Sequence, residues 1–186
     1  MKTLKFVLLS FILCSTIIPA YTQNIVKKYR NYQGFKEGNT FIHKDLITIK
    51  GDTLRVADLQ NKVVWYNMWF IACKACVSEF QELNRIVEEY KDCSNIEFIA
   101  LSYDEPEKIR TFLQKYPFNF RIVCISKIEL ETYYKTIIYP KNLLIDINGY
   151  ILKEKIGGAE NAETAPKVLA EFYKLFQSTM QKYTEK

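Results

Sequence analysis

Apolar runs and amphipathic segments alternate along most of this chain. Three apolar runs predict buried strands over residues 63–69, 96–101 and 120–125. Each run is followed by a segment in which apolar residues recur three and four positions apart, which predicts helices over about residues 73–90, 104–116 and 126–135. Asp104 with Glu107, and Ser126 with Glu129, form the capping-box pattern that starts a helix.

Two hairpins and a last helix flank this alternation. Near the N-terminus, residues 41–50 and 53–56 alternate apolar and polar side chains around a Gly51–Asp52 turn. Residues 142–147 and 150–156 predict a second hairpin, in which Asn148–Gly149 would supply the two positive φ angles of a tight turn. The apolar spacing near the C-terminus predicts a helix over about residues 162–177.

The order of these elements predicts an α/β fold. Alternating strands and helices imply parallel strands, and the second hairpin adds an antiparallel edge. We therefore expect one central mixed sheet flanked by helices on both faces, with a β-hairpin at its N-terminal side. The folded domain would cover residues 41–186, after a polar and poorly ordered lead-in over residues 23–40.

The first 22 residues, 1–22, have the pattern of a secretory signal peptide. Lys2 and Lys5 precede an apolar run of thirteen residues, which is too short to span a bilayer, and cleavage is expected after Ala20 or Thr22. We expect no lipid anchor at Cys14, because a lipid-modified cysteine in such signals usually follows a small residue and Leu13 precedes this one. The protein is therefore expected to be exported, to the periplasm or the cell envelope.

Composition and charge limit the classes of function. The 186 residues are 48% hydrophobic and 25% charged, as in a globular domain. The formal net charge of +5 falls to +3 without Lys2 and Lys5. This excess is too small to predict nucleic-acid binding.

Two cysteines, Cys73 and Cys76, lie where the first buried strand is followed by a helix. Unpaired N–H groups and the helix dipole favour a thiolate at such a place, and the thiolate is the nucleophile. The two intervening residues let the sulfurs meet across one helical turn, so the spacing favours a reversible disulfide. A structural disulfide or half of a zinc site is the alternative, but Cys93, Cys124 and His43 belong to separate elements. Cys93 and Cys124 are expected to be free thiols, although a bridge between them stays open, and His43 is expected to be structural.

Three stretches resemble exported thioredoxin-fold oxidoreductases of the TlpA/ResA type, relatives of the cytochrome c maturation thioredoxins. They are Lys62–Phe70, which leads into the cysteines, Cys73–Glu79, and Tyr139–Pro140 followed by Asn142–Asp146. The resemblance covers about residues 41–176 and implies a thioredoxin fold with a strand–helix insertion over residues 118–135. The chain departs from the family at Ala72, where Trp is usual, and at Lys74–Ala75, which replaces the common Gly–Pro or Glu–Pro pair.

The resemblance also implies roles for individual residues. Cys73 would be the attacking thiol, Cys76 the resolving thiol, and Glu79 the acid beside the active site. Pro140 would be the cis-proline that faces the cysteine pair. The surface that faces the substrate would consist of Pro140, Tyr139, Lys74 and Ala75.

Helix geometry adds two expectations about these residues. Cys76 shares the buried stripe of its helix, so Cys73 is expected to be the thiol that solvent reaches. Glu79 lies on the flank of that stripe, where partial desolvation would raise the pKa of its carboxyl and couple it to the thiols. The alternative is an exposed Glu79 that pairs with Arg85 or Lys74.

These observations predict a thiol–disulfide oxidoreductase that reduces or exchanges disulfides of exported proteins. The resemblance alone favours reduction as the physiological direction. The Cys73–Cys76 disulfide would be the redox group, with no further cofactor and no metal. The partners would be disulfide-bearing exported proteins and a membrane or periplasmic thiol electron donor, without nucleic acid, and the protein would be a monomer.

Two other functions were weighed for the same cysteines. A metal-handling module of related fold, such as a copper chaperone, needs a wider cysteine spacing or an extra His near the pocket, and the sequence offers neither. A peroxide-reducing relative would usually place a Thr and an Arg around one peroxidatic Cys, and the sequence identifies no such group.

Overall fold

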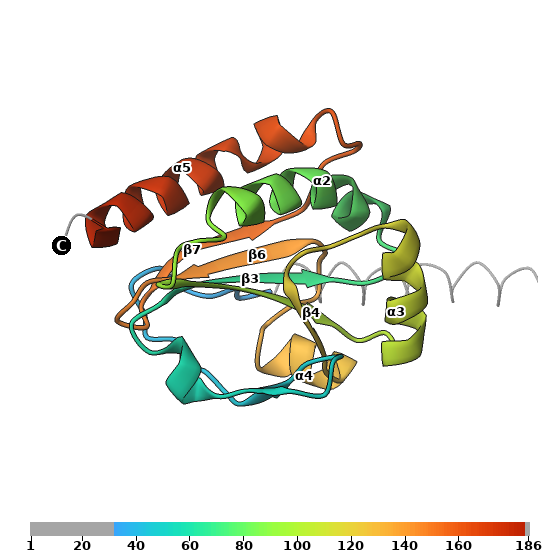
Figure 1. Ribbon diagram of the computed structural model, residues 1–186, viewed down its shortest axis with the longest axis horizontal. Helices are drawn as coiled ribbons and strands as arrows, with labels where there is room; N and C mark the ends of the chain where they lie inside the picture. The colour runs from blue at the N-terminus through green and yellow to red at the C-terminus, as the bar shows by residue number, and fades with distance from the viewer. Residues whose placement is uncertain (1–31, 185–186) are drawn as a thin grey trace, which may run out of the picture. The chain divides into compact units, whose positions relative to one another are not determined.

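A five-stranded sheet forms the centre of the protein, for which the computed structural model describes residues 32–184 (Figure 1). Its strand order is β5-β4-β3-β6-β7. The strands are β3 Val63–Trp69, β4 Ile96–Ser102, β5 Arg121–Cys124, β6 Lys141–Ile145 and β7 Ile151–Ile156. β3, β4 and β5 are parallel, whereas β6 pairs antiparallel with β3 and β7 pairs antiparallel with β6. The predicted mixed sheet with an antiparallel hairpin at its edge is confirmed.

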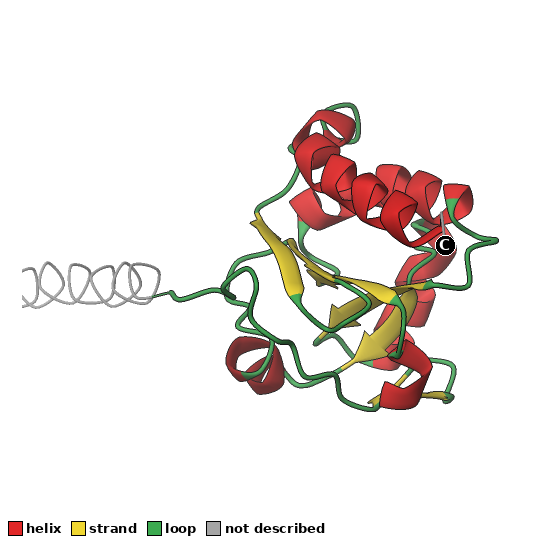
Figure 2. Cartoon of the chain, turned by 90° about the vertical axis from the view of Figure 1, so that its left-hand side faces the viewer, coloured by secondary structure: helices red, strands yellow, loops and turns green. Residues whose placement is uncertain are grey.

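Helices cover the sheet on both sides. They are α2 Lys74–Glu89, α3 Pro106–Lys115, α4 Lys127–Thr132 and α5 Ala165–Thr184. α2 and α5 lie side by side over one face, and α4 lies on the opposite side with the N-terminal hairpin (Figures 1 and 2). α5 continues beyond the predicted end at residue 177, because Thr179 and Met180 extend its buried face.

The central strand β3 has no exposed residue, which explains why its sequence is apolar at every position except Asn67. Trp65 and Trp69 belong to the core between the sheet and α2 with α5, where the Trp65 ring lies 4.8 Å from the ring of Phe172. Tyr66 and Met68 belong to the core on the other face. The strand is therefore held from both sides, and it carries the turn that leads to the cysteines.

The N-terminal hairpin consists of β1 Leu46–Ile47 and β2 Thr53–Leu54, and the 3-10 helix η1 Val56–Leu59 leads from it to β3. Residues of the expected lead-in bind to β7: the Gly38 N–H donates to the Ile151 carbonyl at 2.8 Å, and Thr40 pairs with Tyr150. Residues 34–40 thus belong to the folded domain, contrary to the expectation of poor order. The signal-peptide prediction and residues 23–31 of the lead-in lie outside the described residues.

The predicted cap of α3 is wrong. Glu105, not Asp104, precedes the helix, and Pro106 takes the first helical position. Proline is well suited there because its φ is already helical and the N–H that it lacks would have no partner in the helix. The Asp104 carboxylate is used elsewhere, as described below.

The Asn148–Gly149 turn also differs from the prediction. Only Gly149, with φ of 82°, has a positive φ at this turn. The Asp146 carboxylate accepts the N–H groups of Asn148 and Tyr150 at 2.9 and 2.8 Å, so a side chain holds the turn that we expected two positive φ angles to hold. The hairpin itself is confirmed.

Neither Cys93, Cys124 nor His43 belongs to the Cys73–Cys76 pair. Cys93 and Cys124 are free thiols, as expected. His43 Nδ1 lies 2.8 Å from the Tyr66 hydroxyl, and burial lowers the pKa of His43 to about 4. His43 is therefore a neutral packing residue at physiological pH.

Candidate active site

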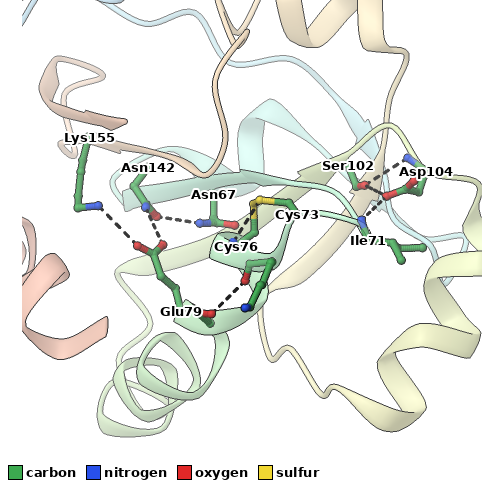
Figure 3. Close-up of a disulfide and its surroundings, with 11 residues drawn as sticks. Asn67, Ile71, Cys73, Cys76, Glu79, Ser102, Asp104, Asn142 and Lys155 are labelled. Carbon is green, nitrogen blue, oxygen red and sulfur yellow. Dashed lines mark hydrogen bonds and ion pairs between the residues drawn. A yellow bond between two sulfur atoms is a disulfide. The ribbon is translucent and has the colours of Figure 1, made fainter. Parts of the chain in front are cut away.

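The two cysteines stand at the start of α2, directly after β3 (Figure 3). The Cys73 N–H donates to the Phe70 carbonyl at 3.0 Å and closes the turn between strand and helix. Cys73 is the N-cap of α2, and its sulfur accepts the Cys76 N–H at 3.2 Å. The first turn of α2 contains no acidic residue, so no carboxylate there opposes a thiolate.

Cys73 and Cys76 form a disulfide, with their Cα atoms 5.2 Å apart. Cys73 is 7% exposed and Cys76 is 1% exposed. Cys73 is therefore the more exposed residue of the pair, although both cysteines are buried in the disulfide form. A partner sulfur can approach Cys73 more easily than Cys76.

A carboxylate of the neighbouring strand end fixes the turn before Cys73. Asp104 Oδ2 accepts the Ile71 N–H at 2.7 Å and the Ser102 hydroxyl at 3.1 Å (Figure 3). Ser102 ends β4, which runs parallel to β3, so both strand ends meet at this edge of the sheet. Sequence reasoning missed this contact because it assigned Asp104 to a helix cap. The signal was its place just after a strand parallel to β3.

Pro140 and the loop after β7 form the other side of the site. The Tyr139–Pro140 peptide bond is cis, as the resemblance implies, and the Pro140 carbonyl accepts the Gly157 N–H at 2.9 Å. A Cβ on Gly158 would lie 2.5 Å from Pro140 Cγ and 3.0 Å from the Ala75 carbonyl oxygen. Only glycine fits between Pro140 and the first turn of α2. Sequence reasoning interpreted Gly157–Gly158 merely as the end of a strand.

An aromatic cluster, Phe70, Tyr103 and Tyr139, adjoins the turn before Cys73. The Tyr139 ring packs edge-on against Phe70 with centroids 5.1 Å apart, and Phe70 stacks on Tyr103 at 5.3 Å. All three rings are partly exposed. Tyr139 thus offers apolar surface next to the cis-proline.

Glu79 is fully buried on α2, and its carboxylate points toward β6 and β7 (Figure 3). Asn142 Nδ2 donates to Glu79 Oε2 at 3.4 Å, and Lys155 Nζ lies 3.5 Å from Oε1. Burial raises the pKa of the Glu79 carboxyl, and the charge of Lys155 and the Asn142 hydrogen bond oppose that rise only in part. The raised pKa has the direction expected from the sequence.

The surface alternative for Glu79 is wrong. Arg85 pairs instead with Glu82 and Glu89, both at 2.8 Å, and Lys74 is exposed to solvent. The partner of Glu79 is Lys155, which the sequence did not indicate. No local pattern tells which strand of the sheet lies opposite this part of α2.

A groove of about 850 Å³ lies beside the cysteine turn. Its lining includes Ala72, Lys74, Val77, Phe112, Tyr116 and Asn161. Lys74 and Ala75 were also predicted to face a substrate. Lys74 lines this groove, whereas the Ala75 carbonyl faces Gly158.

Residues 32–184 contain neither a membrane-spanning helix nor a metal-binding cluster. No helix in this part of the chain is long and apolar enough to cross a membrane. Within the same residues, no group of three or more His, Cys, Asp or Glu side chains is arranged to hold a metal ion.

Known proteins similar to this chain are named thiol–disulfide oxidoreductases. The model of the AhpC/TSA family matches residues 37–153. The thiol-disulfide oxidoreductase ResA of Bacillus thuringiensis is 28% identical over 88% of this chain and 92% of its own. ResA of Bacillus cereus is 30% identical over 72% of this chain and 75% of its own. A solved thiol-disulfide oxidoreductase from Bacteroides fragilis is 25% identical, with a TM-score of 0.58 over 75% of this chain and 98% of its own.

Proposed function

Because the chain belongs to the AhpC/TSA family of thioredoxin-like proteins, we propose that it reduces or exchanges disulfides of exported proteins through Cys73 and Cys76. The observation that carries this proposal is the Cys73–Cys76 disulfide at the N-terminus of α2, with Cys73 the more exposed sulfur. The relatives named thiol-disulfide oxidoreductase ResA support the same chemistry.

The reaction transfers two electrons from the dithiol to a partner disulfide. The Cys73 thiolate attacks one partner sulfur, the partner S–S bond breaks, and its other sulfur leaves as a thiolate. Cys76 then loses its proton and attacks Cys73, which releases the second partner thiolate and forms the Cys73–Cys76 disulfide. The two partner thiolates take up protons, and an external thiol donor restores the dithiol.

The surrounding residues have distinct tasks in this proposal. Asp104 holds the turn before Cys73 through the Ile71 N–H. Pro140 and Tyr139 face the partner segment, and Lys74 and Ala75 flank the sulfurs. Glu79, which is buried beside Asn142 and Lys155, accepts the Cys76 proton when the mixed disulfide is resolved.

Export and partners form the second part of the proposal. Residues 1–22 serve as a signal peptide, and the mature protein works in the periplasm or cell envelope as a monomer. Its partners there are disulfide-bearing exported proteins, among which the resemblance to cytochrome c maturation thioredoxins favours proteins of that pathway. Its electron donor is a membrane or periplasmic thiol protein.

Turnover of a model disulfide tests the activity. Wild-type protein should accelerate the reduction of insulin by dithiothreitol, and Cys73→Ser should abolish the acceleration. Cys93→Ser, which removes a free thiol away from α2's first turn, should leave it unchanged. A wild type without acceleration, or a Cys73→Ser variant that retains it, contradicts the proposal. Export is tested by N-terminal sequencing of the mature protein, which should begin at Tyr21 or Gln23 rather than Met1.

A further inference from the structure

Lys155 stands between the buried Glu79 carboxylate and the loop that supports Pro140. Its ammonium lies 3.5 Å from Glu79 Oε1 and donates to the Gly157 carbonyl at 2.6 Å. We propose that Lys155 is a positioning residue for disulfide exchange, which stabilises the Glu79 carboxylate and couples it to the Gly157–Gly158 loop. This inference rests on the proposed function and deepens it.

The amide of Asn142 fixes how Glu79 is held. Asn142 Oδ1 accepts two hydrogen bonds of 2.9 Å, from Trp65 Nε1 and from Asn67 Nδ2. The Asn142 NH₂ group is therefore the end that faces Glu79, and it can only donate. Glu79 Oε2 thus has a donor in Asn142, and Oε1 lies 3.5 Å from the Lys155 ammonium.

Lys155 is the main charge that opposes the burial of Glu79. Asn142 approaches the carboxyl from β6, Lys155 from β7, the Ala159 N–H from the loop before α5, and Cys76 lies on α2 itself. Of these groups, Lys155 has the largest effect in lowering the pKa of Glu79. The charged side chains of α5, which packs on α2, are exposed to solvent.

The consequence for the reaction concerns one proton. When Cys76 attacks Cys73, its thiol proton needs an acceptor, and an ionised Glu79 one helical turn away on α2 is suited to take it. Without the ammonium, the buried carboxyl would be protonated over a wider pH range and would accept that proton less readily. The Lys155 side chain is 17% exposed, so the pair has contact with solvent for returning the proton.

The hydrogen bond from Lys155 to the Gly157 carbonyl connects Glu79, the proton acceptor, with Pro140 on the substrate side of the site. The Gly157 carbonyl binds Lys155, while the Gly157 N–H binds the Pro140 carbonyl at 2.9 Å. Gly158 then packs against the Pro140 ring. A partner segment that presses on Pro140 therefore acts on the same loop that holds the ammonium beside Glu79.

A carboxyl titration tests the inference without using turnover. In the full oxidised protein, the ¹³C NMR signal of the Glu79 carboxyl is followed against pH in wild type, Lys155→Met and Lys155→Arg. Lys155→Met should raise the titration midpoint of Glu79 by at least about one pH unit, a tenfold shift in its protonation equilibrium. Lys155→Arg should keep it near wild type. Lys153→Met is the matched control, because Lys153 lies on the same strand but pairs with Glu37 at 2.9 Å.

A kinetic cycle tests the consequence for exchange. Resolution of a mixed disulfide at Cys73 should be about tenfold slower at pH 7 in Lys155→Met, and should recover toward wild type as pH rises. In a Glu79→Gln background, Lys155→Met should add no further loss, because the group that it serves is gone.

Two results would overturn the inference: an unchanged Glu79 titration in Lys155→Met, or an equal loss of rate in both backgrounds. Lys155→Gln is judged by the same criteria if Lys155→Met does not fold. A wild type that fails to exchange disulfides would refute the proposed function, whereas the titration would still decide the role of Lys155.

Discussion

Gly158→Ala probes the geometry around Pro140 with a single added methyl group. The new Cβ would lie 2.5 Å from Cγ and 2.7 Å from Cδ of Pro140, and 3.0 Å from the Ala75 carbonyl oxygen. Carbon atoms in favourable contact are about 3.5–4.0 Å apart, so the loop and Pro140 must separate by about 1 Å. Both Pro140 and Ala75 are backbone-fixed neighbours, and neither can move away as a flexible side chain would.

The separation of the loop from Pro140 determines how much Gly158→Ala should change stability and turnover. Overpacking of this kind lowers the free energy of unfolding by about 1–3 kcal/mol. A displacement of about 1 Å in groups that position a substrate can reduce the rate about 100-fold. We therefore expect Gly158→Ala to reduce kcat/KM for insulin reduction by about 10-fold to 100-fold, with the fold retained.

The adjacent glycine supplies the control. Gly157 has φ of 82°, but a Cβ there would meet no atom within 4 Å. Gly157→Ala should lower the free energy of unfolding by about 1 kcal/mol through backbone strain and reduce turnover less than Gly158→Ala does. Urea unfolding and the insulin assay measure both effects. Wild-type turnover in Gly158→Ala, or an equal loss of turnover in the two variants, would refute this reasoning.

Two further predictions concern buried titratable groups. Burial lowers the pKa of His43 from 6.5 to about 4. As pH falls, His43 therefore takes up a proton in the unfolded chain before it does so in the folded protein, and the free energy of unfolding should decrease between pH 6.5 and 4. This loss amounts to at most about 3 kcal/mol, and urea unfolding of His43→Gln should show a shallower fall over that window; identical pH profiles would contradict it. Lys141 is fully buried and pairs with Glu154 at 2.5 Å, so Lys141→Met should lower the free energy of unfolding by about 3 kcal/mol. Adding Glu154→Gln should recover most of this loss in the same assay, and a double variant no more stable than Lys141→Met would count against the pairing.

The sequence predicted best those elements whose residues are uniform over their whole length. β3 is buried throughout and apolar except for Asn67 because the sheet is covered on both faces, and its bounds agree with the predicted run. The helix that begins at the cysteines was equally clear, because its buried stripe recurs at regular intervals. The resemblance added the cis bond before Pro140, which no local pattern indicates.

The sequence did not reveal contacts between elements that only the strand order brings together. Lys155 reaches Glu79 because β7 lies next to β6 at the edge of the sheet, and Lys155 by itself looks like an ordinary strand lysine. Asp104 was assigned to a helix cap because the capping-box pattern depends only on neighbouring residues. Its observed hydrogen bond instead joins it to Ile71, which follows a different strand of the sheet. The need for glycine at position 158 likewise arises from its contact with Pro140, which the sequence does not show.

Mass spectrometry of a trapped mixed disulfide tests the central chemistry most directly. Reduced Cys76→Ser protein is mixed with a folded protein that carries one accessible disulfide, quenched with an alkylating agent, and mapped after proteolysis. The adduct should be joined to Cys73 alone, while Cys93 and Cys124 should be alkylated and unjoined. In wild-type protein the adduct should give way to the Cys73–Cys76 disulfide. Failure to form an adduct at Cys73, or an adduct that persists in wild type, would contradict a reaction in which Cys73 attacks and Cys76 resolves.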